Sequence, residues 1–133
     1  MPFTCAARTD VGIVRSGNED SYLMLAERGV FIVADGMGGH AAGEVASEMA
    51  VRIISREIGS LRGVPDAEAS ERIARSMVTA NEAIFERTLS EHDKRGMGTT
   101  ATALVLLPGR YFIGQVGDSR AYLLRDGEFL QIT

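Results

Sequence analysis

An apolar run leads directly into an aspartate and a cluster of glycines in VFIVADGMGGHAAGE, residues 30–44. Glycine permits sharp turns and lets backbone carbonyls approach a ligand closely. Carboxylate and carbonyl oxygens are the ligands that hard cations such as Mg²⁺ and Mn²⁺ prefer. We therefore expect Asp35 to bridge two such ions and the carbonyl of Gly36 to add a ligand. The alternative is an aspartate that caps the turn before a helix.

A second stretch, SGNEDSY at residues 16–22, follows Arg15. Its two acids, Glu19 and Asp20, open a predicted strand. Because neighbours on a strand point to opposite faces, we expect only one of them to face the site. Asp20 is a candidate for holding metal-bound water, and the planar guanidinium of Arg15 matches phosphate oxygens. The alternative is that these residues belong to a solvated turn.

A third stretch, GQVGDSR at residues 114–120, again ends a strand with a glycine and a carboxylate, here Gly117 and Asp118. This repeats the pattern around Asp35, with a carboxylate beside glycine at the end of a strand. Ser119 follows, but neither histidine lies in a pattern that would make it a base for a serine nucleophile.

A fourth stretch, MGTTATALVL at residues 97–106, carries two adjacent threonines. The hydroxyl groups of Thr99 and Thr100 are able to hydrogen-bond near the site. Packing as β-branched residues of a strand is the simpler interpretation.

The elements that must position these residues follow from hydrophobic periodicity. Strands are expected at residues 21–25, 30–34, 100–107, 111–116 and 121–125. The second of these is wholly apolar, which is typical of a strand buried on both faces. Asp126-Gly127 predicts a two-residue hairpin turn, because both residues tolerate positive φ.

Two helices are expected between the early and late strands. The first begins near Gly43 and carries an apolar stripe as far as Leu61, with Gly63 and Pro65 marking its end. The second covers residues 66–89, and its methionines fit plain core packing. Strands, then two helices, then antiparallel strands predict an α+β fold, in which a helical pair packs on an antiparallel sheet.

Composition limits the class of protein. The chain has 133 residues, 45% of them hydrophobic, which is enough for one small domain with a core. A net charge of −4 without a basic cluster argues against nucleic-acid binding. The single Cys5 excludes an internal disulfide and a CxxC site. The absence of a signal-peptide pattern and of a membrane-spanning apolar run favours a cytoplasmic location.

Four strings together carry a family resemblance: RSGNEDSY, VADGMGGHAAGEVAS, GMGTTATALVL and GQVGDSRAYLLRDGE. In this order and spacing they resemble the bacterial form of the metal-dependent, type 2C serine/threonine protein phosphatases. The resemblance covers Asp10 to Thr133. It implies an α-β-β-α sandwich of two antiparallel sheets flanked by helix pairs. Residues 1–133 would then form the N-terminal portion of a single domain, with its C-terminal part absent.

The resemblance also implies an activity, which is hydrolysis of phosphoserine and phosphothreonine in proteins by water activated by Mn²⁺ or Mg²⁺. Two ions, or three in bacterial members, would be held at positions that match Asp35, Gly36, Asp118 and, through water, Asp20. A cognate serine/threonine kinase is a natural partner.

Two further roles follow from the resemblance. The Arg15 position binds the substrate phosphate. Where many eukaryotic members have a histidine after the Asp-Gly pair, this chain has Met37, and His40 is the nearest substitute as proton donor. The alternative for His40 is a structural role.

Two other interpretations stay open at this point. Because the family's later Asp-Gly and Asp-Asn motifs lie beyond Thr133, the chain is also compatible with a non-catalytic, phosphatase-like interaction module. The string from Gly36 to Ala41 also matches G-x-G-x-x-A, which would indicate a dinucleotide fold if a parallel strand ended in an acid about 20 residues later. That distance falls at Glu57, inside the first predicted helix.

Overall fold

The computed structural model of the chain describes residues 2–39 and 42–133. Two short 3-10 turns, Ala26–Arg28 and His92–Lys94, connect neighbouring elements. The helices and strands, in chain order, are β1 (Asp20–Leu25), β2 (Val30–Met37), α1 (Ala42–Ile58), α2 (Asp66–Ser90), β3 (Gly98–Thr99), β4 (Ala101–Leu107), β5 (Arg110–Val116), β6 (Tyr122–Arg125) and β7 (Glu128–Gln131). This order confirms the predicted α+β class.

The main sheet has the strand order β1-β2-β4-β5, and the short β3 extends it along the end of β2. Strands β6 and β7 form a separate hairpin. Every strand pair in the described part of the chain is antiparallel. A dinucleotide fold requires parallel strands around the glycine-rich turn, so this arrangement contradicts that interpretation.

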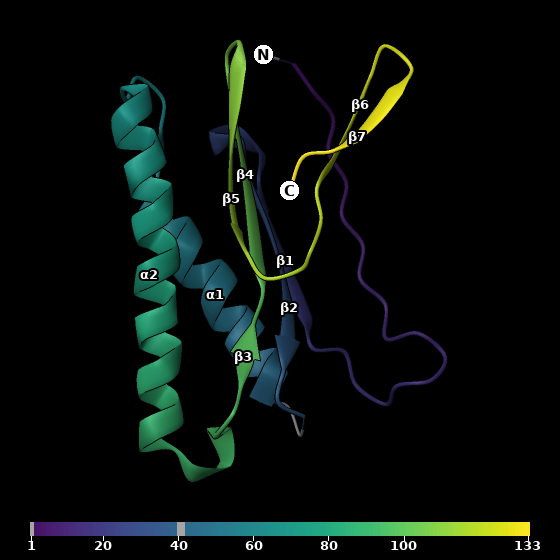
Figure 1. Cartoon of the computed structure of the whole chain (residues 1–133), viewed down its shortest axis with the longest axis vertical. Helices are drawn as coiled ribbons and strands as arrows, with labels where there is room; N and C mark the ends of the chain where they lie inside the picture. Colours follow the sequence, from purple (N-terminus) through teal and green to yellow (C-terminus); the bar gives the residue numbers. More distant parts are fainter. Residues whose placement is uncertain (1, 40–41) are drawn as a thin grey trace.

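Helices α1 and α2 cover one face of the main sheet, as Figure 1 shows. Alternate residues of β2 point into this core, and Val30, Ile32 and Ala34 are almost fully buried there. The intervening Val33 is 47% exposed. The expectation that this strand is buried on both faces was therefore wrong, because helices pack on only one side of it.

The opposite face of the sheet carries the N-terminal segment, with the β6-β7 hairpin further out (Figure 1). Phe3 lies edge-to-face against Phe31, with ring centroids 5.8 Å apart. Within the hairpin, the rings of Tyr122 and Phe129 stack at 4.8 Å. Asp126 and Gly127 take φ of 52° and 79° at its turn, which confirms the predicted hairpin.

Helix α1 ends at Ile58, earlier than the sequence pattern indicated. Gly59 adopts φ of +57°, and its N–H donates to the carbonyl of Ser55 at 3.1 Å, which closes the last turn. Leu61 is nevertheless fully buried, beyond the end of the helix. The apolar stripe thus continued past the helix because the connection also packs into the core.

Helix α2 begins at Asp66, as predicted, and ends one residue later than expected. Its core face carries Ile73, Ala80 and Ile84 at helical spacing. Among the described residues, neither helix combines the length and apolar character needed to cross a membrane.

Candidate metal centre

Asp20 of β1 and Asp35 of β2 are directly opposite each other in the antiparallel register. Side chains of directly opposed residues project to the same face of a sheet, which here is the face away from the helices. The pair thus unites carboxylates from two of the stretches that the sequence analysis selected.

Strand β2 continues beyond Asp35, which corrects the expectation that the strand ends before a turn at Gly36. Gly36 and Met37 remain in the sheet because they pair with Thr99 and Gly98 of β3. Asp35 is therefore held by strand pairing on both sides of its backbone, which fixes the point from which its carboxylate projects.

The pKa of Asp20 is raised above its ordinary value. Partial removal of the carboxyl group from water is the largest cause, followed by a shared hydrogen bond with Asp35 and by the negative charge of that residue. The positive charge of Arg15 acts in the opposite direction. Two carboxyl groups that face each other in this way are a pair that a divalent cation would stabilise in the ionised form.

The side chain of Glu19 lies on the opposite face of the strand from that of Asp20. Its carboxylate packs against the backbone of Gly43, in the first turn of α1, where the helix dipole favours negative charge. Its carbonyl accepts hydrogen bonds from the N–H of Gly36 at 3.1 Å and from Ser47 Oγ at 2.7 Å. Glu19 and Asp20 thus lie on opposite faces of the strand, as the alternation of strand side chains predicts.

Gly36 is required for helix packing. A Cβ at this position would overlap the carbonyl of Gly43 and would lie 2.7 Å from the carbonyl oxygen of Glu19. The absence of a side chain therefore lets the start of α1 approach β2 closely. Its carbonyl remains a predicted metal ligand.

The face that carries Asp20 and Asp35 is hollowed by a cavity of about 220 Å³, to which Arg8 and Ser119 also contribute. Arg15 is exposed in the loop before β1. Its effect on the pKa of Asp20 shows that its charge acts on this acidic pair. The hollow therefore combines oxygen donors with the guanidinium group of Arg8, a set suited to cations and phosphate oxygens together.

Asp118 lies in the bend that follows β5, with its side chain exposed. The neighbouring Ser119 hydroxyl is 2.9 Å from Thr100 Oγ1, which in turn accepts the N–H of Asp35 at 3.0 Å. Ser119 is thus engaged in a structural hydrogen bond. Thr100 is more than the packing residue that its β-branched type suggested, and no sequence signal separated its role from that of Thr99.

Two other predicted features concern His40 and the number of metal ligands that converge. His40 lies outside the described residues. Within residues 2–39 and 42–133, no group of three or more histidine, cysteine or acidic side chains converges as a metal site would require. Asp20 and Asp35 are thus a pair of oxygen donors, which fits a hard divalent cation in chemistry and supplies only part of its usual ligand number.

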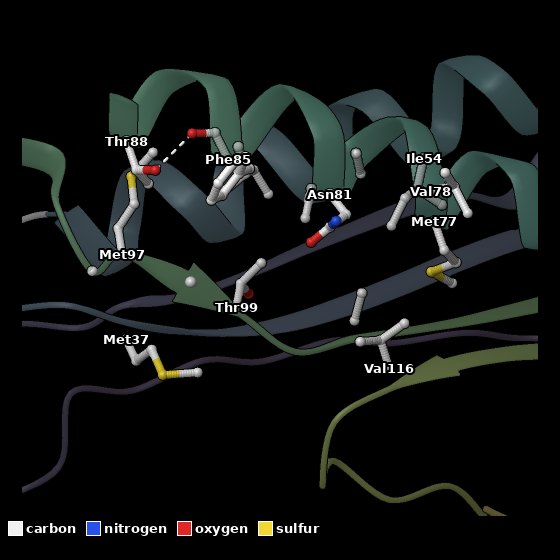
Figure 2. Close-up of a pocket in the computed structure, with 16 residues that line it drawn as sticks. Met37, Ile54, Met77, Val78, Asn81, Phe85, Thr88, Met97, Thr99 and Val116 are labelled. Carbon is white, nitrogen blue, oxygen red and sulfur yellow. Dashed lines mark hydrogen bonds between the residues drawn. The ribbon is translucent and has the colours of Figure 1, made fainter. Parts of the chain in front are cut away.

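A larger cavity of about 600 Å³ lies between the helices and the sheet, near β3 (Figure 2). Its lining is mostly apolar and includes Met37, Met77 and Met97, with Asn81 projecting from α2 toward the sheet (Figure 2). A thioether has no proton to donate at Met37. Met37 therefore cannot act as a proton donor, and the titratable pair Asp20 and Asp35 lies on the other face of the sheet.

An antiparallel sheet with a helical pair on one face and a carboxylate pair on the other defines an α+β protein with a candidate site for a divalent cation. Comparison with known sequences identifies the family within this class. The model of the family described as Protein phosphatase 2C matches residues 14–133. The chain belongs to this family.

The relatives include serine/threonine protein phosphatase PstP of Mycobacterium tuberculosis, which is 42% identical over 128 residues, covering 96% of this chain and 24% of PstP. Serine/threonine phosphatase stp of Listeria monocytogenes is 42% identical over 130 residues, covering 95% of this chain and 52% of the relative. This chain therefore spans about a quarter of the length of PstP and about half of the length of the Listeria phosphatase.

A crystal structure of the PstP catalytic domain in complex with two manganese ions superimposes with a TM-score of 0.84 and 42% identity. The match covers 96% of this chain and 54% of that domain. The main sheet, the helical pair and the hairpin are thus arranged as in a solved member of the family.

Proposed function

We propose that the whole protein hydrolyses phosphoserine and phosphothreonine in proteins, and that residues 1–133 form the N-terminal portion of its catalytic domain. The observation that carries this proposal is the Asp20–Asp35 pair, which faces a hollow on the sheet. Membership of the Protein phosphatase 2C family and the two manganese ions in the related PstP structure support it.

In this proposal, the carboxylate of Asp35 and the carbonyl of Gly36 would hold the Mn²⁺ or Mg²⁺ ions. Asp20 would hold a water of the metal centre, and Asp118 would contribute to a further ion. Two carboxylates are few for two divalent ions. We therefore propose that oxygen ligands from elsewhere in the whole protein complete the centre.

The divalent ions, when bound, supply a nucleophilic water near neutral pH and neutralise charge on the phosphoryl group. Arg15 binds and orients the phosphoryl oxygens through its planar guanidinium, and so stabilises the charge that builds up on them. The ionised carboxylate of Asp20 accepts a hydrogen bond from water and orients it. His40 donates a proton to the departing serine or threonine oxygen.

Other assignments belong to the whole protein. We propose that its substrates are phosphoproteins, that a cognate serine/threonine kinase is a partner, and that it works in the cytoplasm. The scattered basic residues and the negative net charge support a protein substrate over nucleic acid. The names of the relatives support phosphorylated serine and threonine as the residues on which it acts.

Phosphate release from a phosphothreonine peptide tests the proposal. The whole protein should release phosphate with Mn²⁺, should stop when EDTA is added, and should lose activity in Asp35→Asn. Asp93→Asn, which alters an exposed acid beside Lys94, is the matched control and should remain active. Full activity in Asp35→Asn, or activity that EDTA leaves unchanged, would contradict the proposed metal centre.

A further inference from the structure

Thr100 lies between β3 and β4, belongs to neither strand, and is only 7% exposed. It contacts the backbone of Asp35 twice. The N–H of Thr100 donates to the carbonyl of Asp35 at 2.9 Å, and Thr100 Oγ1 accepts the N–H of Asp35 at 3.0 Å. The single residue thus fixes both polar groups of the peptide units that flank the Asp35 side chain.

The same hydroxyl reaches a second segment. Thr100 Oγ1 is 2.9 Å from the hydroxyl of Ser119. A threonine hydroxyl has one proton and two lone pairs, so it can accept from Asp35 and still bond Ser119 in either direction. Thr100 is therefore a direct link between the Asp35 strand and the residue after Asp118.

The methyl group of Thr100 packs on this second segment as well. Gly117 has φ of +95°, and a Cβ there would lie 2.6 Å from Thr100 Cγ2. The turn therefore needs glycine both for its backbone conformation and for its close approach to Thr100.

Gln115 holds the turn from its other side. Its Nε2 donates to the carbonyl of Gly117 at 3.1 Å and to that of Ser119, while its Oε1 accepts a hydrogen bond from Thr102. The backbone around Asp118 is thus anchored at both ends, whereas the Asp118 side chain is exposed. The turn therefore fixes the backbone position of Asp118 and leaves its carboxylate exposed to solvent.

Strands β2 and β5 are not neighbours, because β4 lies between them. The link through Thr100 crosses this gap at the beginning of β4. We propose that Thr100 is a positioning residue, which couples the strand that carries Asp35 to the turn that carries Asp118. This inference rests on the proposed metal centre, because the coupling matters only when both carboxylates serve one set of ions.

Hydrogen exchange of the metal-free 133-residue chain tests the link itself. Thr100→Val keeps the shape and removes the hydroxyl, whereas Thr100→Ser keeps the hydroxyl. In Thr100→Val, the Asp35 amide should exchange about fivefold faster or more, the equivalent of one ordinary hydrogen bond. The backbone NMR signals of residues 117–119 should move in the same variant. Both effects should be small in Thr100→Ser.

Ser76→Ala is the matched control, because it removes a fully buried hydroxyl that bonds the Ile73 carbonyl inside α2. It should leave the signals of Asp35 and of residues 117–119 unchanged. Unaltered exchange at Asp35 and unaltered signals of the turn in Thr100→Val would overturn the proposal.

Chemical-shift titration with diamagnetic Mg²⁺ tests the coupling, because each amide then reports mainly the ions that bind close to it. In the unaltered chain and in Thr100→Ser, amides beside Asp35 and in residues 117–119 should shift with one midpoint concentration of Mg²⁺. In Thr100→Val, the turn should require about fivefold more Mg²⁺ than the strand. A common midpoint in Thr100→Val would refute the coupling. If Mg²⁺ shifted no amide near Asp35 in the unaltered chain, the proposed metal centre would fail, while the exchange data would still decide the link.

Discussion

Asp20 and Asp35 face each other across the β1-β2 pair, on the sheet face opposite the helices. The pKa of Asp20 is raised by partial removal from water and then by its Asp35 neighbour. The sheet therefore holds two acids where ionisation of both is unfavourable in the absence of a cation. This relationship is the physical basis for the metal centre that we propose at this position.

The stability of the metal-free chain should depend on pH through Asp20. A carboxyl group whose folded pKa is raised stabilises the fold below its ordinary pKa, and this contribution is lost as pH rises through the folded pKa. Asp20→Asn should therefore increase the free energy of unfolding at pH 7 and change it little at pH 3. The gain should be below about 1 kcal/mol, because solvent screens an exposed pair.

Urea unfolding with EDTA, at both pH values, measures this difference. Glu82→Gln, which neutralises an exposed acid on α2, is the control and should show no comparable pH dependence. An equal effect of Asp20→Asn at pH 3 and pH 7 would show that the acidic pair carries no electrostatic cost.

Arg15 should matter both for substrate binding and for the acidic pair. In the whole protein, Arg15→Ala should lower kcat/KM for a phosphorylated peptide about tenfold or more, with Arg15→Lys intermediate, because lysine lacks the planar fork. Because the charge of Arg15 lowers the pKa of Asp20, the same variant should raise that pKa in NMR titration.

Arg56→Ala provides the comparison for Arg15. This arginine is exposed on α1 beside Glu57 and should affect neither quantity. An Arg15→Ala protein with the original kcat/KM would remove Arg15 from the phosphate site, whatever its effect on Asp20.

Gly36 should tolerate no side chain. In Gly36→Ala, the new Cβ would overlap backbone atoms of Gly43 and approach the carbonyl of Glu19, so α1 must move away from β2. We expect a loss of about 3 kcal/mol in the free energy of unfolding. Gly17→Ala, where a Cβ meets nothing within 4 Å, should cost little. Thermal unfolding of the two variants should separate them clearly, and similar stabilities would contradict the close approach.

Ser47 should anchor α1 to the beginning of β1. It is fully buried, donates to the carbonyl of Glu19 at 2.7 Å and lies 2.8 Å from the hydroxyl of Ser21. Ser47→Ala leaves that carbonyl short of a partner and should cost about 1–2 kcal/mol. Ser55→Ala, which removes a hydroxyl bonded only within α1, should cost less. Denaturant unfolding that ranks the two in the reverse order would refute the anchoring role.

Local sequence patterns predicted the elements of the fold well where a single physical cause dominates. The hairpin at Asp126-Gly127 follows from positive φ, and the start of α2 at Asp66 follows from periodicity and charge. The end of α1 was misplaced, because the left-handed cap at Gly59 competes with an apolar pattern that continues to Leu61.

The sequence predicted the carboxylates of the site, but it did not predict the hydrogen bonds that connect their segments. Strand alternation correctly separated Glu19 from Asp20. The link from Asp35 through Thr100 to Ser119 joins residues far apart in sequence, and its hydrogen bonds depend on the register of three strands. Nothing in the threonine itself distinguishes such a hydroxyl from a packed one.

Calorimetric titration of the purified 133-residue chain with Mn²⁺ tests the central claim most directly. We expect weak binding, with a Kd of about 10⁻⁴ M or higher, because the acidic pair supplies few charged ligands. This binding should disappear in Asp35→Asn and persist in Asp93→Asn. Equal Mn²⁺ binding by the unaltered chain and by Asp35→Asn would contradict the assignment of Asp35 as the bridging metal ligand.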